Sequence, residues 1–204
     1  LLDLTGFNGR VDAIYFTKNK NDLPPNQLET LDEFRIKKLG LNQNPKSSKF
    51  DFVVIGGGMA GTCAALSAAR LGLKVALIQN RPILGGNNSS EVRVHLGARI
   101  NLEPYPALGN LVNEIGPQRG GNAQPKAYYE DQKKLDAVLN ESNISLFLNH
   151  HANEVVMQGN TIQKVLAENL ETGEKLIFEA PIFADCTGDG TIGYLAGAEY
   201  LMGR

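Results

Sequence analysis

Apolar residues near the middle of the chain follow two different patterns in immediate succession. Residues 51–55 (DFVVI) and 74–78 (KVALI) are short, mostly apolar runs that suit strands buried inside a sheet. Between them, residues 59–72 (MAGTCAALSAARLG) are rich in alanine and other helix formers, with small side chains for close packing. The pattern predicts a βαβ unit, the building block of a parallel sheet.

The segments before this unit predict a small appendage. Residues 10–16 alternate weakly between apolar and polar positions, like a short strand. Residues 25–40 are predicted to be a helix that ends at a glycine. The polar stretch 41–49 contains proline and serines, which favours a linker. We therefore expect residues 1–49 to be an N-terminal extension and linker, and residues 50–204 to be the main domain.

The pattern changes again after the βαβ unit. Residues 85–121 hold seven glycines and little periodicity, and a loop of that length inside a compact domain is usually functional. Residues 125–140 predict a helix whose apolar face is made of Tyr128, Leu135, Val138 and Leu139. Residues 144–190 are predicted to be mostly strands, with a two-residue turn at Gly159–Asn160. The expected fold is α/β, a Rossmann-like nucleotide-binding domain with a parallel sheet and an inserted antiparallel meander.

Composition and charge exclude several kinds of partner. The chain has 204 residues, 42% hydrophobic and 21% charged, and its net charge of -2 gives no electrostatic grip on nucleic acid or anionic lipid. Cys63 and Cys186 lack the spacing of redox or zinc sites, and we expect no metal site. The longest apolar stretch, 64–78, is interrupted by two charges and is shorter than the roughly 18 apolar residues that a membrane span needs. We therefore expect a soluble protein with a small-molecule ligand.

Three glycines after the first strand match the GxGxxG pattern of dinucleotide-binding proteins. Gly56 would make the tight turn, Gly58 would let a pyrophosphate approach the backbone, and Gly61 would let the helix pack on the strand. The phosphates would then lie at the N-terminus of the helix, where free N–H groups and the helix dipole favour negative charge. The alternative is a tight turn with a purely structural role.

The end of the second strand departs from this pattern. An acidic residue is expected there, about 20 residues after the glycines, to accept hydrogen bonds from ribose hydroxyls. The chain has Gln79 instead. Its amide oxygen can still accept a hydrogen bond, but without a charge, so we expect a weaker ribose contact that is shared with Asn80. The change removes the strongest argument for NAD in particular.

Several further motifs carry a resemblance to a known family. They are VVIGGGMAGTCAALSAARLGLKVALIQ (53–79), RPILGGNNSSEVRVHLG (81–97), GNLVNEIG (109–116) and ADCTGDGTIGYLAGAEY (184–200). Together they resemble the FAD-dependent oxidoreductases of the glutathione-reductase-like superfamily. Members of that family continue beyond the position of Arg204. The resemblance therefore implies that FAD is the cofactor, and that residues 50–204 are an FAD-binding domain truncated at its C-terminal end.

The resemblance also implies which residues bind FAD. The first glycine motif would line the phosphates, the end of the second strand would hold the adenosine ribose, and the next glycine pair would follow the cofactor inward. A backbone group after the later strand would meet the adenine, and the DCTGDG return would lie beside the cofactor. The implied residues are Gly56, Gly58, Met59, Ala60, Gly61, Gln79, Asn80, Arg81, Gly85, Gly86, Ala152, Thr187, Gly188 and Asp189.

Candidates for chemistry are Arg93 and His95. They are two residues apart, so on an extended segment both side chains would face the same way, toward the flavin. A positive group there would stabilise the reduced ring, and a histidine could take a substrate proton as hydride leaves. The alternative is a structural or surface role on a loop. For His150 and His151, at the end of a predicted strand and without an acid at metal-ligand spacing, we expect a structural or surface role, and for the two cysteines we expect packing roles.

The function implied by the resemblance is hydride transfer between FAD and a small organic substrate, with carbohydrate-like or other polyhydroxylated molecules as the substrate class. Two alternatives remain open at this point. An NAD(P)-dependent dehydrogenase shares the opening motif, and a non-catalytic nucleotide-binding fragment would retain the fold without the reaction. Oligomeric state and cellular compartment are left open by the sequence.

Overall fold

The computed structural model describes residues 14–41, 44–97 and 99–201, and the chain divides between residues 43 and 44 into two compact units. The first unit contains helix α1 (Leu28–Leu39), which ends at Gly40 in the left-handed conformation, with φ 64°. This confirms the helix predicted over 25–40. Of the strand expected over 10–16, residues 10–13 lie outside the described part, and residues 14–16 are not a strand.

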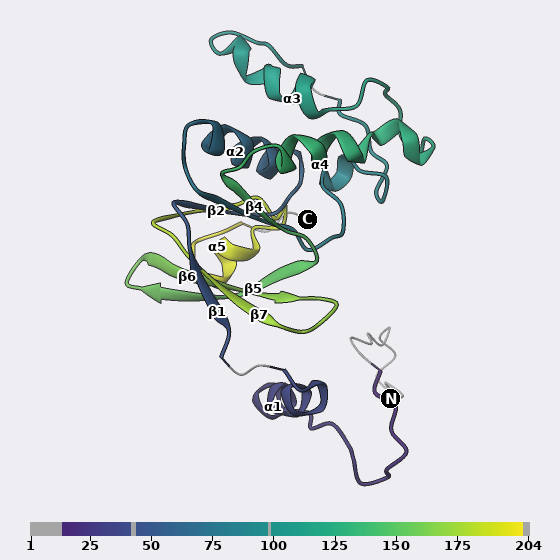
Figure 1. Ribbon diagram of the computed structural model, residues 1–204, viewed down its shortest axis with the longest axis vertical. Coiled ribbons are helices and arrows are strands. Elements are labelled where there is room, and N and C mark those ends of the chain that lie inside the picture. The colour runs from purple at the N-terminus through teal and green to yellow at the C-terminus, as the bar shows by residue number, and fades with distance from the viewer. Residues whose placement is uncertain (1–13, 42–43, 98, 202–204) are drawn as a thin grey trace. The chain divides into compact units, whose positions relative to one another are not determined.

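The second unit is built on a parallel sheet in the order β4-β3-β2-β8 (Figure 1). Its strands are β2 (Phe52–Ile55), β3 (Val75–Ile78), β4 (Ile144–Phe147) and β8 (Ile182–Asp185). Helix α2 (Met59–Arg70) connects β2 to β3, as the βαβ pattern predicts. Helices α3 (Gly109–Ile115) and α4 (Asp131–Leu139) lie between β3 and β4 in the chain, and α2 and α4 cover the same face of the sheet.

A second sheet covers the other face, in the order β1-β7-β6-β5. Strands β5 (His150–Gln158), β6 (Thr161–Asn169) and β7 (Lys175–Glu179) form the predicted antiparallel meander. Alternate residues of β2 divide the core, because Val53 and Ile55 pack toward the meander while Val54 packs toward α2. The short helix α5 (Thr191–Leu195) follows β8.

The sequence prediction of a linker over 41–49 is wrong for its second half. Residues Lys46–Lys49 form strand β1, which pairs in parallel with β7 and runs directly into the core at Phe50. All four residues of β1 are exposed, so no apolar alternation marks the strand. Backbone pairing with β7 and the hydrogen bond from Ser47 Oγ to Glu179 Oε1 (2.6 Å) hold it in place.

Two further expectations change. The loop predicted over 85–121 contains α3, whose seven residues are too few to show a helical period. The helix predicted over 125–140 is broken at Glu130, which has φ 45° and separates a 3-10 turn (Lys126–Tyr129) from α4. The break changes the buried face, so that Lys134 is fully buried while Leu139 is 62% exposed. No helix among the described residues is long and apolar enough to cross a membrane.

Candidate functional site

The turn after β2 contains three glycines with different structural requirements. Gly56 has φ 107°, and a Cβ atom there would lie 2.1 Å from the Cys186 carbonyl oxygen. A Cβ atom on Gly61 would lie 1.8 Å from the Gly56 carbonyl oxygen. Gly58 has φ -65° and no heavy atom within 4 Å of the place where its Cβ would be. The fold therefore requires glycine at positions 56 and 61. The space beside Gly58 is open, and Gly58 lines a cavity.

The N-terminus of α2 begins at this open space. Gly58 is its N-cap, no side chain caps the helix, and its first turn has no acidic residue. The first N–H groups of a helix have no partner within the helix, and the helix dipole adds a partial positive charge there. Helix α2 has 12 residues, and its N-terminus is therefore suited to bind a phosphate or another anion.

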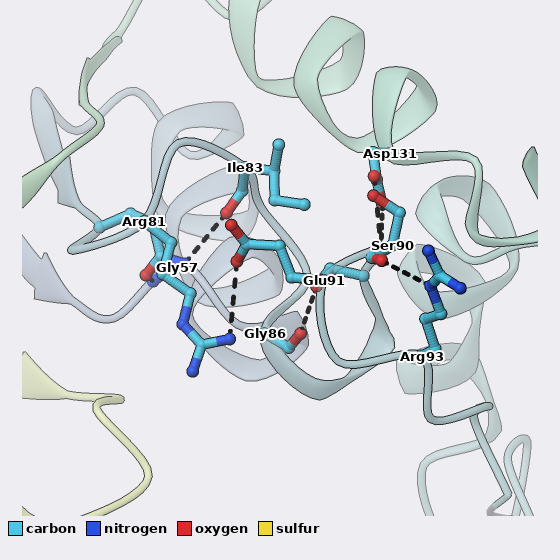
Figure 2. A network of polar contacts seen from close by, with 10 residues as sticks. Gly57, Arg81, Ile83, Gly86, Ser90, Glu91, Arg93 and Asp131 are labelled. Atoms are coloured by element: carbon cyan, nitrogen blue, oxygen red, sulfur yellow. Dashed lines mark hydrogen bonds and ion pairs between the residues drawn. The ribbon is translucent and has the colours of Figure 1, made fainter. Parts of the chain in front are cut away.

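The side chain of Gln79 connects this turn to the segment that follows β3. Gln79 is 4% exposed, its Oε1 accepts a hydrogen bond from Gly57 N–H (2.8 Å), and its Nε2 donates to the Ile83 carbonyl (3.1 Å). Figure 2 shows the network around this contact, with Gly57 and Ile83 labelled. Both ends of the amide are therefore committed to the protein, and Gln79 acts as a brace of the glycine turn.

A second glycine pair lies against the first turn. Gly85 N–H donates to the Gly57 carbonyl (2.8 Å), and Gly85 forms a parallel bridge with Gly58. Gly85 has φ 107° and Gly86 has φ 57°, so both need the left-handed conformation that favours glycine. The stem of the buried Lys134 packs beneath Gly85, and burial lowers the pKa of its ammonium group against the opposing effect of Asp131 and Glu130.

The loop after β8 is shaped by one carboxylate. Asp185 Oδ1 accepts hydrogen bonds from Thr187 N–H (3.1 Å) and Thr187 Oγ1 (2.7 Å), and Oδ2 accepts them from the N–H groups of Ile192 (2.8 Å) and Gly193 (2.9 Å). Burial raises the pKa of this carboxyl, but the hydrogen bonds lower it by more, so the net pKa lies below its usual value. The carboxylate therefore ties the loop to the first turn of α5.

These three segments line one cavity of about 470 Å³, a size within the range of about 300–1,000 Å³ for small-molecule and cofactor sites. It lies beyond the carboxyl ends of β2, β3 and β8, where open α/β sheets bind their ligands. The cavity wall includes most of the residues expected to bind a cofactor, namely Gly56, Gly58, Met59, Ala60, Gln79, Asn80, Arg81, Gly85, Gly86, Ala152, Thr187, Gly188 and Asp189. Gly61 lies behind the wall, in the contact between helix and turn that its place in the motif predicts.

Comparison with known families shows which family the chain belongs to. A family model described as FAD dependent oxidoreductase matches residues 51–204. The chain belongs to this family. As an FAD-dependent oxidoreductase it uses FAD, and the open space at Gly58, next to the uncapped N-terminus of α2, fits the cofactor's diphosphate.

Individual relatives match parts of this FAD-dependent oxidoreductase. It is 27% identical over 161 residues to a tRNA uridine 5-carboxymethylaminomethyl modification enzyme, MnmG, of Buchnera aphidicola. This alignment covers 75% of the present chain and 25% of the relative. It is 43% identical over 67 residues to glycerol-3-phosphate dehydrogenase 2 of Mycobacterium tuberculosis, which covers 33% of this chain and 10% of the relative. The chain thus spans a quarter or less of the length of these curated relatives.

A solved structure shows the same fold. The E. coli quinol fumarate reductase FrdA superposes with a TM-score of 0.52 at 15% identity, over 70% of this chain and 33% of that one. The likeness confirms the expected fold class, an α/β fold with a Rossmann-like parallel sheet and a second sheet that contains antiparallel strands.

The structure separates Arg93 from His95, because the segment is not extended. Arg93 has φ 63°, and its Nε donates to the Ser90 carbonyl (3.0 Å; Figure 2). Arg93 does not line the cavity. His95 does line it. Asn122 Oδ1 accepts from both the His95 main-chain N–H (2.9 Å) and the ring Nδ1 (2.9 Å), which leaves Nε2 as the ring nitrogen that can accept a proton. Only His95 therefore lies at the cavity, and the prediction that both side chains face the same way is wrong.

Sequence reasoning missed several cavity residues, among them Asn88 and His150. Asn88 is 2% exposed, and its Oδ1 has no hydrogen-bond partner. His150 directs Nδ1 to the Leu148 carbonyl (2.6 Å) and packs edge-on against Phe147. A polar residue just after the glycine pair was the available signal for Asn88. His150 was expected at the end of a strand, but the sequence did not indicate that this strand belongs to the parallel sheet. Among the described residues no group of three His, Cys, Asp or Glu side chains could hold a metal ion.

Proposed function

We propose that the protein transfers hydride between FAD and a small organic substrate. The observation that carries this proposal is the open position beside Gly58, because the fold does not need glycine there and a dinucleotide does. The surrounding backbone of the two glycine turns and the loop after β8 is supported by Gln79 and Asp185, so the site is held in shape without depending on mobile side chains.

Different residues of the cavity suit different chemical parts of FAD. The N-terminus of α2 would hold the diphosphate. Asn80 would take the ribose position, because the amide of Gln79 is already engaged on both sides. Ala152, which is buried in β5 at the cavity wall, would offer backbone groups to the adenine. Thr187, Gly188 and Asp189 would lie beside the cofactor.

His95 is a residue of this cavity that can move a proton. When bound, FAD accepts or donates the hydride, and the protein supplies position and proton transfer. Since Asn122 holds Nδ1, the free Nε2 would take a substrate hydroxyl proton as hydride leaves the adjacent carbon. For the substrate we propose a polyhydroxylated molecule, and the similarity of one third of the chain to a glycerol-3-phosphate dehydrogenase supports this class.

The test is an absorption spectrum of the purified protein before and after incubation with FAD and desalting, followed by a screen of sugars, sugar acids and polyol phosphates. We expect flavin bands that persist after desalting and that bleach with at least one polyhydroxylated compound. A protein that binds NADH or NADPH and refuses FAD would overturn the proposal. Retained FAD that no compound of this class bleaches would overturn only the substrate class.

A further inference from the structure

The wall of the FAD cavity contains an acceptor that lacks a donor. Of the buried side-chain nitrogen and oxygen atoms within residues 14–41, 44–97 and 99–201, Asn88 Oδ1 is the one without a hydrogen-bond partner. Asn88 is 2% exposed and lines the cavity at the end of the 3-10 turn Gly86–Asn88. A buried acceptor left unpaired loses its hydration without compensation, so such an atom calls for a partner.

The orientation of this amide is determined by its other end. Asn88 Nδ2 donates a hydrogen bond to the Val94 carbonyl (3.1 Å), and the Asn88 main-chain N–H donates to the Gly85 carbonyl (3.0 Å). Turning the amide over would place Oδ1 against the Val94 carbonyl, which would oppose two acceptors. The oxygen is therefore the atom that remains for a ligand.

The chemistry of the acceptor selects one part of the cofactor. Phosphate oxygens carry negative charge and accept hydrogen bonds, so Asn88 Oδ1 does not suit the diphosphate, which has its own place at the N-terminus of α2. The adenosine ribose belongs to the end of β3, at Gln79 and Asn80. Asn88 follows the second glycine pair, in the part of the wall that also contains Val94 and His95.

We infer that Asn88 positions the flavin half of the cofactor, with its Oδ1 accepting a hydrogen bond from a ribityl hydroxyl or a ring N–H. The inference rests on the proposed function, because it requires FAD in this cavity. Asn88 is a positioning residue, and removing its side-chain oxygen should weaken FAD binding while leaving the affinity for ADP unchanged, since ADP lacks the flavin half.

The test compares Asn88→Leu with the unchanged protein by titration with FAD and, separately, with ADP. Leucine is close in size and removes both the acceptor and the donor. We expect FAD to bind about tenfold more weakly, as the loss of one hydrogen bond in a buried site implies. ADP affinity should stay within about twofold, and the visible band of bound FAD should shift because its contact with the protein has changed. Asn88→Ala, which removes the same atoms without steric demand, covers the case in which the leucine variant does not fold.

Asn143→Leu is the matched control. Asn143 Nδ2 also donates to a backbone carbonyl, that of Ala69 (3.1 Å), but Asn143 does not line the cavity. This variant should retain the FAD affinity of the unchanged protein. Equal losses of FAD and ADP affinity in the Asn88 variants would show that Asn88 only shapes the loop, and unchanged FAD affinity would show that water satisfies the oxygen; either result overturns the inference. If the unchanged protein fails to bind FAD, the proposed function fails instead.

Discussion

Replacing Gln79 by glutamate tests the brace that holds the glycine turn. The pattern of dinucleotide-binding proteins suggests that an acid at this position would improve the ribose contact. The structure leads to the opposite expectation. Gln79 Nε2 donates to the Ile83 carbonyl, and an ionised carboxylate would place an acceptor there in a side chain that is 4% exposed.

The size of the effect follows from three contributions. Glutamate keeps the acceptor for Gly57 N–H and strengthens that bond by about 1 kcal/mol, because hydrogen bonds to charged groups are about twice as strong as neutral ones. Loss of the hydrogen bond to Ile83 leaves a carboxylate oxygen facing the Ile83 carbonyl oxygen, both buried and both acceptors, which costs about 1–3 kcal/mol of stability. Burial of the negative charge adds to this cost. The carboxyl can also become protonated, which restores a donor for the Ile83 carbonyl. Protonating a glutamate of pKa about 4.3 at pH 7 costs about 3.7 kcal/mol, so the loss of stability cannot exceed that value. We expect Gln79→Glu to lower the free energy of unfolding by about 2–3 kcal/mol at pH 7.

The assay is urea unfolding between pH 4 and pH 7, with FAD titration beside it. The folded state prefers the protonated acid, so it raises the pKa of Glu at position 79 above the unfolded value of about 4.3. The loss of stability is then complete above the raised pKa and disappears as the pH falls below about 4.3. FAD binding at pH 7 should weaken, because the turn that we propose for the diphosphate loses its support.

Gln163→Glu, on the exposed side of β6, is the matched control and should change stability little at any pH in this range. The reasoning is refuted if Gln79→Glu is as stable as the unchanged protein at pH 7 and binds FAD more tightly. In that case the side chain at position 79 would face the ribose, as the sequence pattern alone suggests.

Three further predictions concern single residues of the site. Asp185→Asn should lower the free energy of unfolding by about 1–2 kcal/mol, as the loss of a helix cap does. Because the pKa of Asp185 is lowered in the folded state, the carboxylate stabilises the fold fully above the unfolded pKa of about 3.9, and this stabilisation is lost as the pH falls through the folded pKa. Urea unfolding of both proteins at pH 7 and pH 3 would show the difference. Lys134→Met keeps the side-chain stem beneath Gly85 and removes a buried ammonium group whose pKa is lowered by burial. The unchanged protein should therefore gain stability relative to this variant as the pH rises toward the unfolded pKa of about 10.4. A stability difference that does not change with pH would contradict the lowered pKa of Lys134. His95→Gln should slow flavin bleaching by the substrate at least about 100-fold with unchanged FAD affinity, whereas an unaffected rate would exclude proton transfer by His95.

Local patterns predicted the parts of the fold that depend on neighbouring residues. The βαβ unit, the glycine turn and the meander were predictable because buried strands, helix formers and turn residues stand next to one another in the chain. Strand β1 was not, since its pairing with β7 spans about 130 residues and leaves all its side chains exposed. The break at Glu130 was not predictable either. Tyr129, the residue before it, is buried and its hydroxyl donates to the Arg93 carbonyl (2.7 Å), a contact between segments 36 residues apart.

The candidate site shows the same division. The motif located the cavity wall, but the roles of single side chains depended on contacts that only the folded chain brings together. Gln79 is engaged by Gly57, 22 residues away, and the amide of Asn88 is oriented by a carbonyl in a loop without regular structure. Arg93 turns away from the cavity because its backbone is left-handed, which no spacing argument includes.

The most direct test of the central claim is the FAD affinity of Gly58→Ala, measured together with its thermal unfolding. The backbone of Gly58 suits alanine and the added Cβ meets open space. The gain from a less flexible unfolded chain is offset by alanine being a poorer N-cap than glycine, so the variant without cofactor should differ in stability from the unchanged protein by less than about 1 kcal/mol. Its FAD affinity should fall at least about tenfold, because the methyl group would occupy the diphosphate position. Gly120→Ala, also in open space but away from the cavity, should change neither property by much. If Gly58→Ala binds FAD as tightly as the unchanged protein, the cofactor does not lie against this turn and the account is contradicted.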